Sequence, residues 1–235
     1  MHIISSKSLS LPDLRTLIFE GSKIKLSSEV IQKIQECREY LDQKIATTSE
    51  PIYGINTGFG ALCDVRIHSE NLTKLQENLV RSHACGMGDL VPKHIVKLML
   101  LLKIKSLSYG HSGVQLATVN RLVAFYNNDI LPVIYTQGSL GASGDLAPLA
   151  HLALPLIGEG MVWYKGTQKP TCEVLEGFDW RPITLQSKEG LALLNGTQFM
   201  TAYGVHCLLK SHKLSYMADL IGALSLDAYD GRTEP

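Results

Sequence analysis

The chain has 235 residues, and its 22 lysine and arginine residues balance 22 aspartate and glutamate residues, so the formal net charge at pH 7 is zero. With 45% hydrophobic residues, this length suffices for one large globular domain or two small ones. The even charge balance argues against a basic surface for nucleic acid, so we expect no nucleic-acid partner.

The sequence shows no export signal and no membrane span. Its first residues lack a basic segment followed by an apolar core, and lysines interrupt the apolar run at residues 95–107. The five cysteines are odd in number and form no C-x-x-C pair, which favours free thiols over disulfides or zinc. We therefore expect a cytoplasmic protein with no membrane association, no metal and no diffusible cofactor.

The N-terminal region predicts a short strand and two helices. Residues 2–5 are suited to an edge strand, and Ser10 and Pro12 are typical of the start of a helix, which is expected to run through Glu20. Ser27 or Ser28 caps the next helix, whose polar side is expected to include Arg38. The positions expected to face the core share helical spacing: Val30, Ile31, Ile34, Cys37, Leu41 and Ile45.

A glycine-rich loop at residues 53–60 follows these helices. It is either a mobile surface turn or a lid that carries a functional side chain, and Tyr53 is the candidate. From the residues alone, a tyrosine that anchors its loop by a hydrogen bond is the favoured interpretation. Ser69 then caps a helix that ends near His83.

The second half of the chain is also mainly helical. Buried helices are predicted at residues 92–105 and 114–127, and a small hairpin at residues 161–166. The apolar pattern of residues 197–227 predicts a very long helix with apolar side chains on more than one face. We expect such a helix to need a further partner surface.

The loop at residues 138–145 has glycines at three-residue intervals and leads into an apolar run. A helix cap, with Asp145 at the helix start, is the ordinary interpretation of such a loop. A phosphate cradle and a nucleophile elbow fit less well, because the spacing is G-x-x-G-x-x-G and Asp145 replaces the last glycine of G-x-S-x-G. A fourth possibility is chemical: in Ala142-Ser143-Gly144, the glycine nitrogen can attack the alanine carbonyl, and loss of water from the serine then leaves an exocyclic methylene.

Four separated blocks resemble the aromatic amino acid ammonia-lyases, namely residues 53–60, 82–88, 138–151 and 188–198. The resemblance covers essentially the whole chain. It implies that Ala142, Ser143 and Gly144 form a 4-methylideneimidazol-5-one (MIO) prosthetic group autocatalytically. The Ser82-His83 pair is similar to the histidine branch of the family, which implies elimination of ammonia from L-histidine to give urocanate.

The same resemblance assigns roles to individual residues. It implies that Tyr53 is a catalytic acid/base, that Ser82 and His83 contact the substrate ring, and that Asn195 holds the substrate and the prosthetic carbonyl. A site built for a phenyl ring would leave imidazole nitrogens unpaired, which costs about 1–3 kcal/mol each. Two positions depart from the family pattern: Lys103 and Lys105 stand where many members have arginine and asparagine.

The implied fold is mainly α, an ammonia-lyase-like helical fold with a small α+β N-terminal region and long core helices. We expect residues 1–110 to form the N-terminal region and residues 111–235 the first part of the central helical bundle, with the C-terminal half of the enzyme absent. The complete enzyme is expected to be a homotetramer that binds a small amino acid, and this chain alone is expected to be inactive. The alternatives are a phenylalanine or tyrosine ammonia-lyase or aminomutase, and a non-catalytic helical or nucleotide-binding module.

Overall fold

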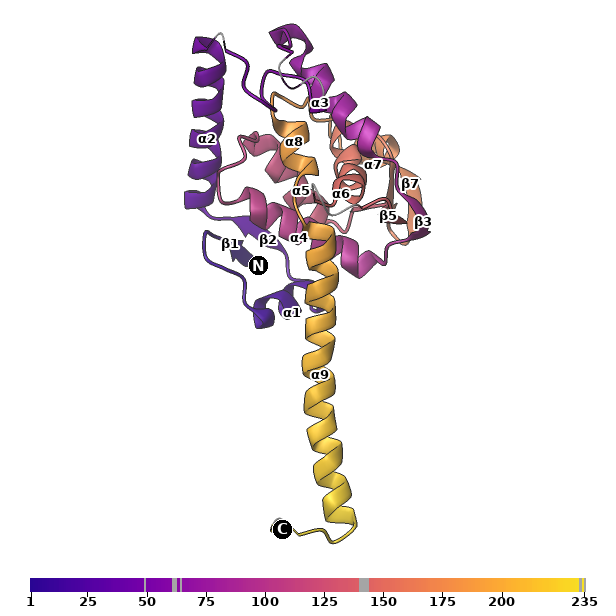
Figure 1. The fold of residues 1–235 in the computed structure, drawn as a ribbon. Helices are drawn as coiled ribbons and strands as arrows, with labels where there is room; N and C mark the ends of the chain where they lie inside the picture. The colour runs from indigo at the N-terminus through magenta and orange to yellow at the C-terminus, as the bar shows by residue number, and fades with distance from the viewer. Residues whose placement is uncertain (49, 61–62, 64, 140–143, 233, 235) are drawn as a thin grey trace.

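The computed structural model describes residues 1–48, 50–60, 63, 65–139, 144–232 and 234. They form a mainly helical body from which one long helix projects (Figure 1), so the predicted helical fold class is confirmed. The helices are α1 (Leu11–Phe19), α2 (Ser28–Thr47), α3 (Ser69–His83), α4 (Lys93–Leu107), α5 (Leu116–Asn127), α6 (Leu146–Ala153), the short 3-10 helix η2 (Leu154–Ile157), α7 (Thr171–Gly177), α8 (Glu189–Leu194) and α9 (Gln198–Ala228).

Short strands form small sheets around these helices. The pairs are β1 (His2–Ile4) parallel to β2 (Ile24–Leu26), β3 (Met87–Leu90) antiparallel to β5 (Tyr135–Gln137), and β6 (Met161–Tyr164) antiparallel to both β4 (Leu131–Pro132) and β7 (Thr167–Pro170). The β6–β7 hairpin turns at Lys165 and Gly166, whose φ angles of 49° and 84° suit a two-residue hairpin loop. The strand near the N-terminus and this hairpin are confirmed, whereas β2 to β5 were not predicted.

The first two helices begin as their sequences predict. Ser10 caps α1 in a reciprocal arrangement with Asp13, and Ser27 caps α2 by accepting a hydrogen bond from the backbone N–H of Val30. The prediction that Arg38 lies on the polar side of α2 is wrong. Arg38 is buried on the same stripe as Val30 and Leu41, because its guanidinium has partners inside the protein.

The next helix starts differ from the prediction by one or two residues. α3 begins at Ser69, so His68 takes the N-cap position expected for Ser69. α5 begins at Leu116 rather than at residue 114, because Gln115 has an extended backbone and donates its N–H to the carboxylate of Glu189 at 2.8 Å. These shifts leave the order of the helices unchanged.

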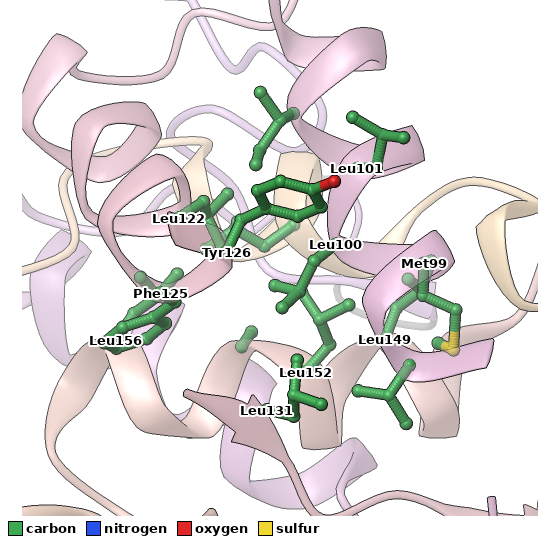
Figure 2. Close-up of a cluster of buried hydrophobic side chains, with 14 of the residues drawn as sticks. Met99, Leu100, Leu101, Leu122, Phe125, Tyr126, Leu131, Leu149, Leu152 and Leu156 are labelled. Carbon is green, nitrogen blue, oxygen red and sulfur yellow. The ribbon is translucent and has the colours of Figure 1, made fainter. Parts of the chain in front are cut away.

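The hydrophobic core lies where α4, α5 and α6 meet, and Figure 2 shows its labelled side chains pointing toward one another. Its members include Met99, Leu100 and Leu101 from α4, Leu122, Phe125 and Tyr126 from α5, and Leu149 and Leu152 from α6. Tyr126 keeps its hydroxyl satisfied by donating to the carbonyl of Leu17 at 2.7 Å. The core therefore joins segments on both sides of residue 110, and the division into residues 1–110 and 111–235 stays a prediction.

The long helix α9 lies mostly outside this core. It ends at Ala228, close to the predicted end, and of its residues, all of which the structure describes, Ala202 is the buried one. Leu214 is 68% exposed, and Ile221 and Leu224 are also exposed, as predicted for an uncovered apolar helix. In Figure 1 the helix leaves the body near its first turns and carries the C-terminus far from it. No helix of the described residues is long and apolar enough to cross a membrane.

Candidate functional site

Gly144, the last residue of the predicted prosthetic tripeptide, is pressed against the turn between α8 and α9. It has a φ of 96° and forms a parallel β-bridge with Gly196, and a Cβ atom at position 144 would collide with the Gly196 carbonyl oxygen. The next residue, Asp145, donates its backbone N–H to the same oxygen at 2.8 Å. Only glycine fits position 144. Ala142 and Ser143 lie outside the described residues.

Asp145 lies at the start of α6, as the cap interpretation predicts, but its side chain makes no capping hydrogen bond. Its buried carboxylate instead accepts from the Ser139 hydroxyl at 2.8 Å and from the backbone N–H of Met200 at 3.0 Å. Asp145 therefore joins Ser139 to the first turn of α9.

Tyr53 lies on a turn that other residues hold in place. The Asn56 side chain accepts from the Ile52 N–H at 2.6 Å and donates to the Glu50 carbonyl at 3.0 Å. The Tyr53 ring meets Phe59 edge-on at 6.0 Å, its side chain is 59% exposed, and its hydroxyl has no hydrogen-bond partner among the described residues. Among the described residues, Tyr53 therefore makes no hydrogen bond that anchors its loop, and its role stays a prediction.

Ser82 and His83 form the last turn of α3, where helix carbonyls lack partners within the helix. The Nδ1 atom of His83 lies 2.9 Å from the Leu79 carbonyl oxygen and 3.1 Å from the Ser82 hydroxyl. Because a carbonyl can only accept, Nδ1 carries the proton, which leaves Nε2 of a neutral His83 as an acceptor.

The turn after His83 lies against the start of the glycine-rich loop. Gly86 donates its N–H to Nε2 of His151 at 3.0 Å, and a Cβ atom at Gly138 would lie 3.2 Å from the Gly86 Cα atom. Burial lowers the pKa of His151, which favours the neutral ring that this hydrogen bond needs. The pairing of β3 with β5 thus brings the turn that follows the Ser82-His83 pair beside residue 138.

Asn195 is the C-cap residue of α8 and is exposed. Its side-chain amide donates to the Leu191 carbonyl at 3.1 Å, and its side-chain oxygen has no hydrogen-bond partner among the described residues. In the described part of the chain, no hydrogen bond joins the side chains of Tyr53, His83 and Asn195 to one another.

α8 connects the segments that carry these residues, and Figure 1 shows it between α2 and α3 in that view, directly above α9. A Cβ atom at Gly54, beside Tyr53, would lie 2.5 Å from Leu191, and one at Gly190 would lie 2.6 Å from the Gln76 carbonyl oxygen on α3. The Asn195–Gly196 turn contacts Gly144 directly. The short helix and the turn after it thus contact the Tyr53 loop, α3 and Gly144.

Buried charges hold α8 in place, and sequence reasoning missed them. Glu189 is fully buried, and its carboxylate accepts from the backbone N–H groups of Gln115 and Gln186 and from the Thr118 hydroxyl, at 2.7–2.8 Å. Arg38 donates to the carbonyl and the hydroxyl of Ser187 at 3.0 and 3.1 Å. A charge within an otherwise apolar helical pattern is the signal that could have pointed to such residues.

Lys103 and Lys105 bind carbonyl oxygens in different parts of the structure. Lys103 donates to the carbonyl oxygens of Ala192 and Asn195, beneath the candidate site. Lys105 donates to the Ser5 carbonyl at 2.6 Å and lies over the Tyr109 ring, so it supports the N-terminal region. Among the described residues, no cluster of three or more His, Cys, Asp or Glu side chains is arranged to hold a metal ion.

Comparison with solved structures places the fold among ammonia-lyases and aminomutases. The histidine ammonia-lyase of Trypanosoma cruzi aligns with a TM-score of 0.88 and 35% identity over 98% of this chain and 45% of that one. The phenylalanine aminomutase of Pantoea agglomerans aligns with a TM-score of 0.91 and 30% identity over 100% of this chain and 45% of that one.

The family model for aromatic amino acid lyases matches residues 9–235, and the chain belongs to that family. A curated relative, the histidine ammonia-lyase of Halalkalibacterium halodurans, is 45% identical over 231 residues, which cover 98% of this chain and 45% of the relative. The histidine ammonia-lyase of Staphylococcus aureus is 43% identical over 228 residues, or 97% of this chain and 45% of that protein. The chain thus spans about half the length of the curated relatives that it matches.

Proposed function

We propose that this chain is the part of a histidine ammonia-lyase that carries the prosthetic tripeptide, and that the complete enzyme converts L-histidine to urocanate and ammonia. The observation that carries the proposal is the identity of 43–45% to curated histidine ammonia-lyases over 97–98% of the chain. The Ser82-His83 pair supports the choice of histidine, because the acceptor Nε2 of His83 suits the N–H of a substrate imidazole.

The described end of the tripeptide fits the family's prosthetic group. Position 144 has a left-handed backbone and no room for a side chain, which agrees with a glycine whose nitrogen takes part in a tight ring. When formed, the MIO group supplies the electrophile that activates histidine for loss of ammonia. Asp145 and the Asn195–Gly196 turn hold its glycine end in place.

The chain's own side chains divide the remaining work. His83 orients the imidazole, and Asn195 offers its side-chain oxygen to the substrate amino group. The Tyr53 oxygen, exposed on a turn fixed by Asn56, serves as the general base, and in its phenolate form it accepts the β-proton of the substrate and becomes the hydroxyl.

A chimera tests the proposal, because the chain spans less than half of its relatives. Residues 1–235 replace the matching part of the Halalkalibacterium halodurans enzyme, and urocanate formation is followed by its absorbance. We expect activity in the chimera, a mass smaller by two waters than the sequence predicts, and loss of both in Ser143→Ala. Full turnover by Ser143→Ala would refute the electrophile, and an unmodified mass would favour a non-catalytic module.

The substrate is tested by side-by-side assays of histidine, phenylalanine and tyrosine. Replacing Ser82 with Phe and His83 with Leu should lower kcat/KM for histidine by about tenfold or more, because imidazole nitrogens lose their partners. The midpoint of thermal unfolding should change little, since both residues end a helix and neither belongs to the core. Unchanged histidine kinetics, or a preference for phenylalanine or tyrosine in the unmodified chimera, would favour another lyase or an aminomutase.

The proposal extends to the assembly. We propose that the complete enzyme is a cytoplasmic homotetramer and that residues 1–235 alone show little or no turnover, because further site residues come from the remaining length and from neighbouring subunits. The exposed apolar side chains of α9 support this view. Full lyase activity of the isolated chain, measured with histidine, would overturn it.

A further inference from the structure

Lys103 is a buried amine in the middle of the hydrophobic core. It is only 1% exposed, and it lies in α4 among fully buried leucine and isoleucine residues. Its Nζ atom donates to the carbonyl oxygen of Ala192 at 2.9 Å and to that of Asn195 at 2.8 Å. A buried lysine is expensive to keep unless its donors are satisfied, so these two contacts are the reason that the core tolerates it.

Both acceptors belong to the C-terminal end of α8, where carbonyl groups lack partners within the helix. Backbone carbonyls at a helix end carry partial negative charge, which suits a lysine donor. Burial lowers the pKa of Lys103 from 10.5 to about 7. Either protonation state retains at least two N–H donors for the two carbonyls.

The residue after Asn195 is the one that touches the prosthetic loop. Gly196 has a φ of 139°, and its carbonyl accepts from the Asp145 N–H at 2.8 Å beside the Gly144 bridge. Lys103 therefore fixes the Asn195 carbonyl, which immediately precedes the contact between Gly196 and Gly144. The Asn195 side chain extends from the same fixed residue.

We propose that Lys103 is a positioning residue. It holds the Asn195–Gly196 turn against Gly144 and so positions both the Asn195 side chain and Gly144. The importance of this positioning for catalysis rests on the proposed function, whereas the contact of Lys103 with the Ala192 and Asn195 carbonyls does not. Lys105 offers a matched control, since it is also a buried lysine of α4 that binds a backbone carbonyl. Its partner is Ser5, close to the hydrogen bond from the Ser27 N–H to the Ile4 carbonyl.

Amide hydrogen exchange on the 235-residue chain, resolved by NMR, tests the proposal. In Lys103→Met, we expect the Asp145 amide to exchange about tenfold faster or more, with the Ser27 amide unchanged. In Lys105→Met, we expect the Ser27 amide to exchange faster and the Asp145 amide to be unchanged. Lys103→Arg keeps donors at this position and should restore most of the Asp145 protection. Equal loosening of Asp145 in both methionine variants, or in neither, would overturn the proposal.

A measurement on the unmodified chain covers the case in which Lys103→Met fails to fold. The Nζ hydrogens of Lys103 should exchange slowly enough to be observed and should show couplings to the carbonyl carbons of Ala192 and Asn195. Absence of these signals would overturn the proposal. The urocanate assay of the chimera remains separate: its failure would refute the lyase function while leaving the exchange result on Lys103 intact.

Discussion

α8 and α9 are neighbours in the chain, yet they are held in opposite ways. α8 has six residues, and other elements contact it along its length through Gln76, Lys103, Gln115 and the Gly54 turn. α9 has 31 residues, and its first turns hold it, through the Met200 N–H and Ala202, while Leu214 and later apolar residues are exposed. The length of a helix therefore does not indicate how firmly the helix is held, whereas the number of residues that contact it does.

The two helices also differ in the forces that hold them. Polar contacts of the buried Lys103 and Glu189 side chains fix α8, and such contacts specify position closely because each needs defined distances and angles. In α9 the Met200 N–H makes one such contact, to Asp145, and packing holds the following turns, for example where the His206 ring lies 4.6 Å from the His94 ring of α4. Substitutions in α8 should thus be costly, and substitutions in the far half of α9 should be nearly neutral.

The largest difference in stability effect between the two helices is expected when an acidic residue is replaced by its amide. Glu189→Gln replaces one acceptor oxygen with a donor that faces N–H and O–H groups, so it should lower the free energy of unfolding by about 2–4 kcal/mol. Asp219→Asn, on the exposed part of α9, should stay within about 0.5 kcal/mol. Urea unfolding measures both, and similar losses in the two variants would contradict the comparison.

A pair of glycines should respond with opposite signs. Gly190→Ala in α8 places a Cβ atom 2.6 Å from the Gln76 carbonyl oxygen, which should destabilise the chain by about 1–3 kcal/mol. Gly222→Ala in α9 meets no atom within 4 Å and should stabilise the helix by about 0.5–1 kcal/mol. Thermal unfolding of the two variants shows whether α8 packs as tightly against α3 in solution as it does in the structure.

The pH dependence of stability should report on Lys103. Because burial lowers its folded-state pKa from 10.5 to about 7, the unfolded chain binds more protons between these values. The free energy of unfolding should therefore rise with pH across this window, by at most about 1.4 kcal/mol per pH unit from this group. This contribution should disappear in Lys103→Met and persist in Lys210→Met on exposed α9, as urea unfolding from pH 7 to 9 would show; equal slopes in all three proteins would refute it.

The smallest effect is expected at the exposed apolar face of α9. Leu214→Gln should change the free energy of unfolding of this chain by no more than about 0.5 kcal/mol, since the side chain is 68% exposed. A loss above about 1.5 kcal/mol would mean that the far half of α9 is covered in solution. Sedimentation of the same variant would then show whether a second copy covers it.

The helices were largely predictable, because repeated apolar spacing over many residues leaves a clear pattern. The predicted helix at residues 197–227 and the observed α9 (Gln198–Ala228) differ by one residue at each end. β2 has only three residues, so the alternation of Ile24, Lys25 and Leu26 is too short to form such a pattern, and its parallel pairing with β1 spans a whole helix. Short elements are defined by distant partners, which a local pattern does not contain.

The candidate site was predictable only in part. Motifs located Tyr53, His83 and Asn195, but the buried contacts of Arg38, Lys103 and Glu189 depend on segments far apart in the sequence. Arg38 shows the difficulty, because a charged residue in an amphipathic helix is usually solvated. Its guanidinium instead reaches Ser187, 149 positions away.

The hydrogen bond from Met200 to Asp145 also sets an order in time. Synthesis proceeds from the N-terminus, so the glycine-rich loop leaves the ribosome before residues 196–200 exist. Until those residues arrive, neither the Gly196 carbonyl nor the Met200 N–H is present to shape position 144. The backbone around Gly144 therefore takes its final form only after the start of α9 has been made, which places any chemistry there late in the maturation of the protein.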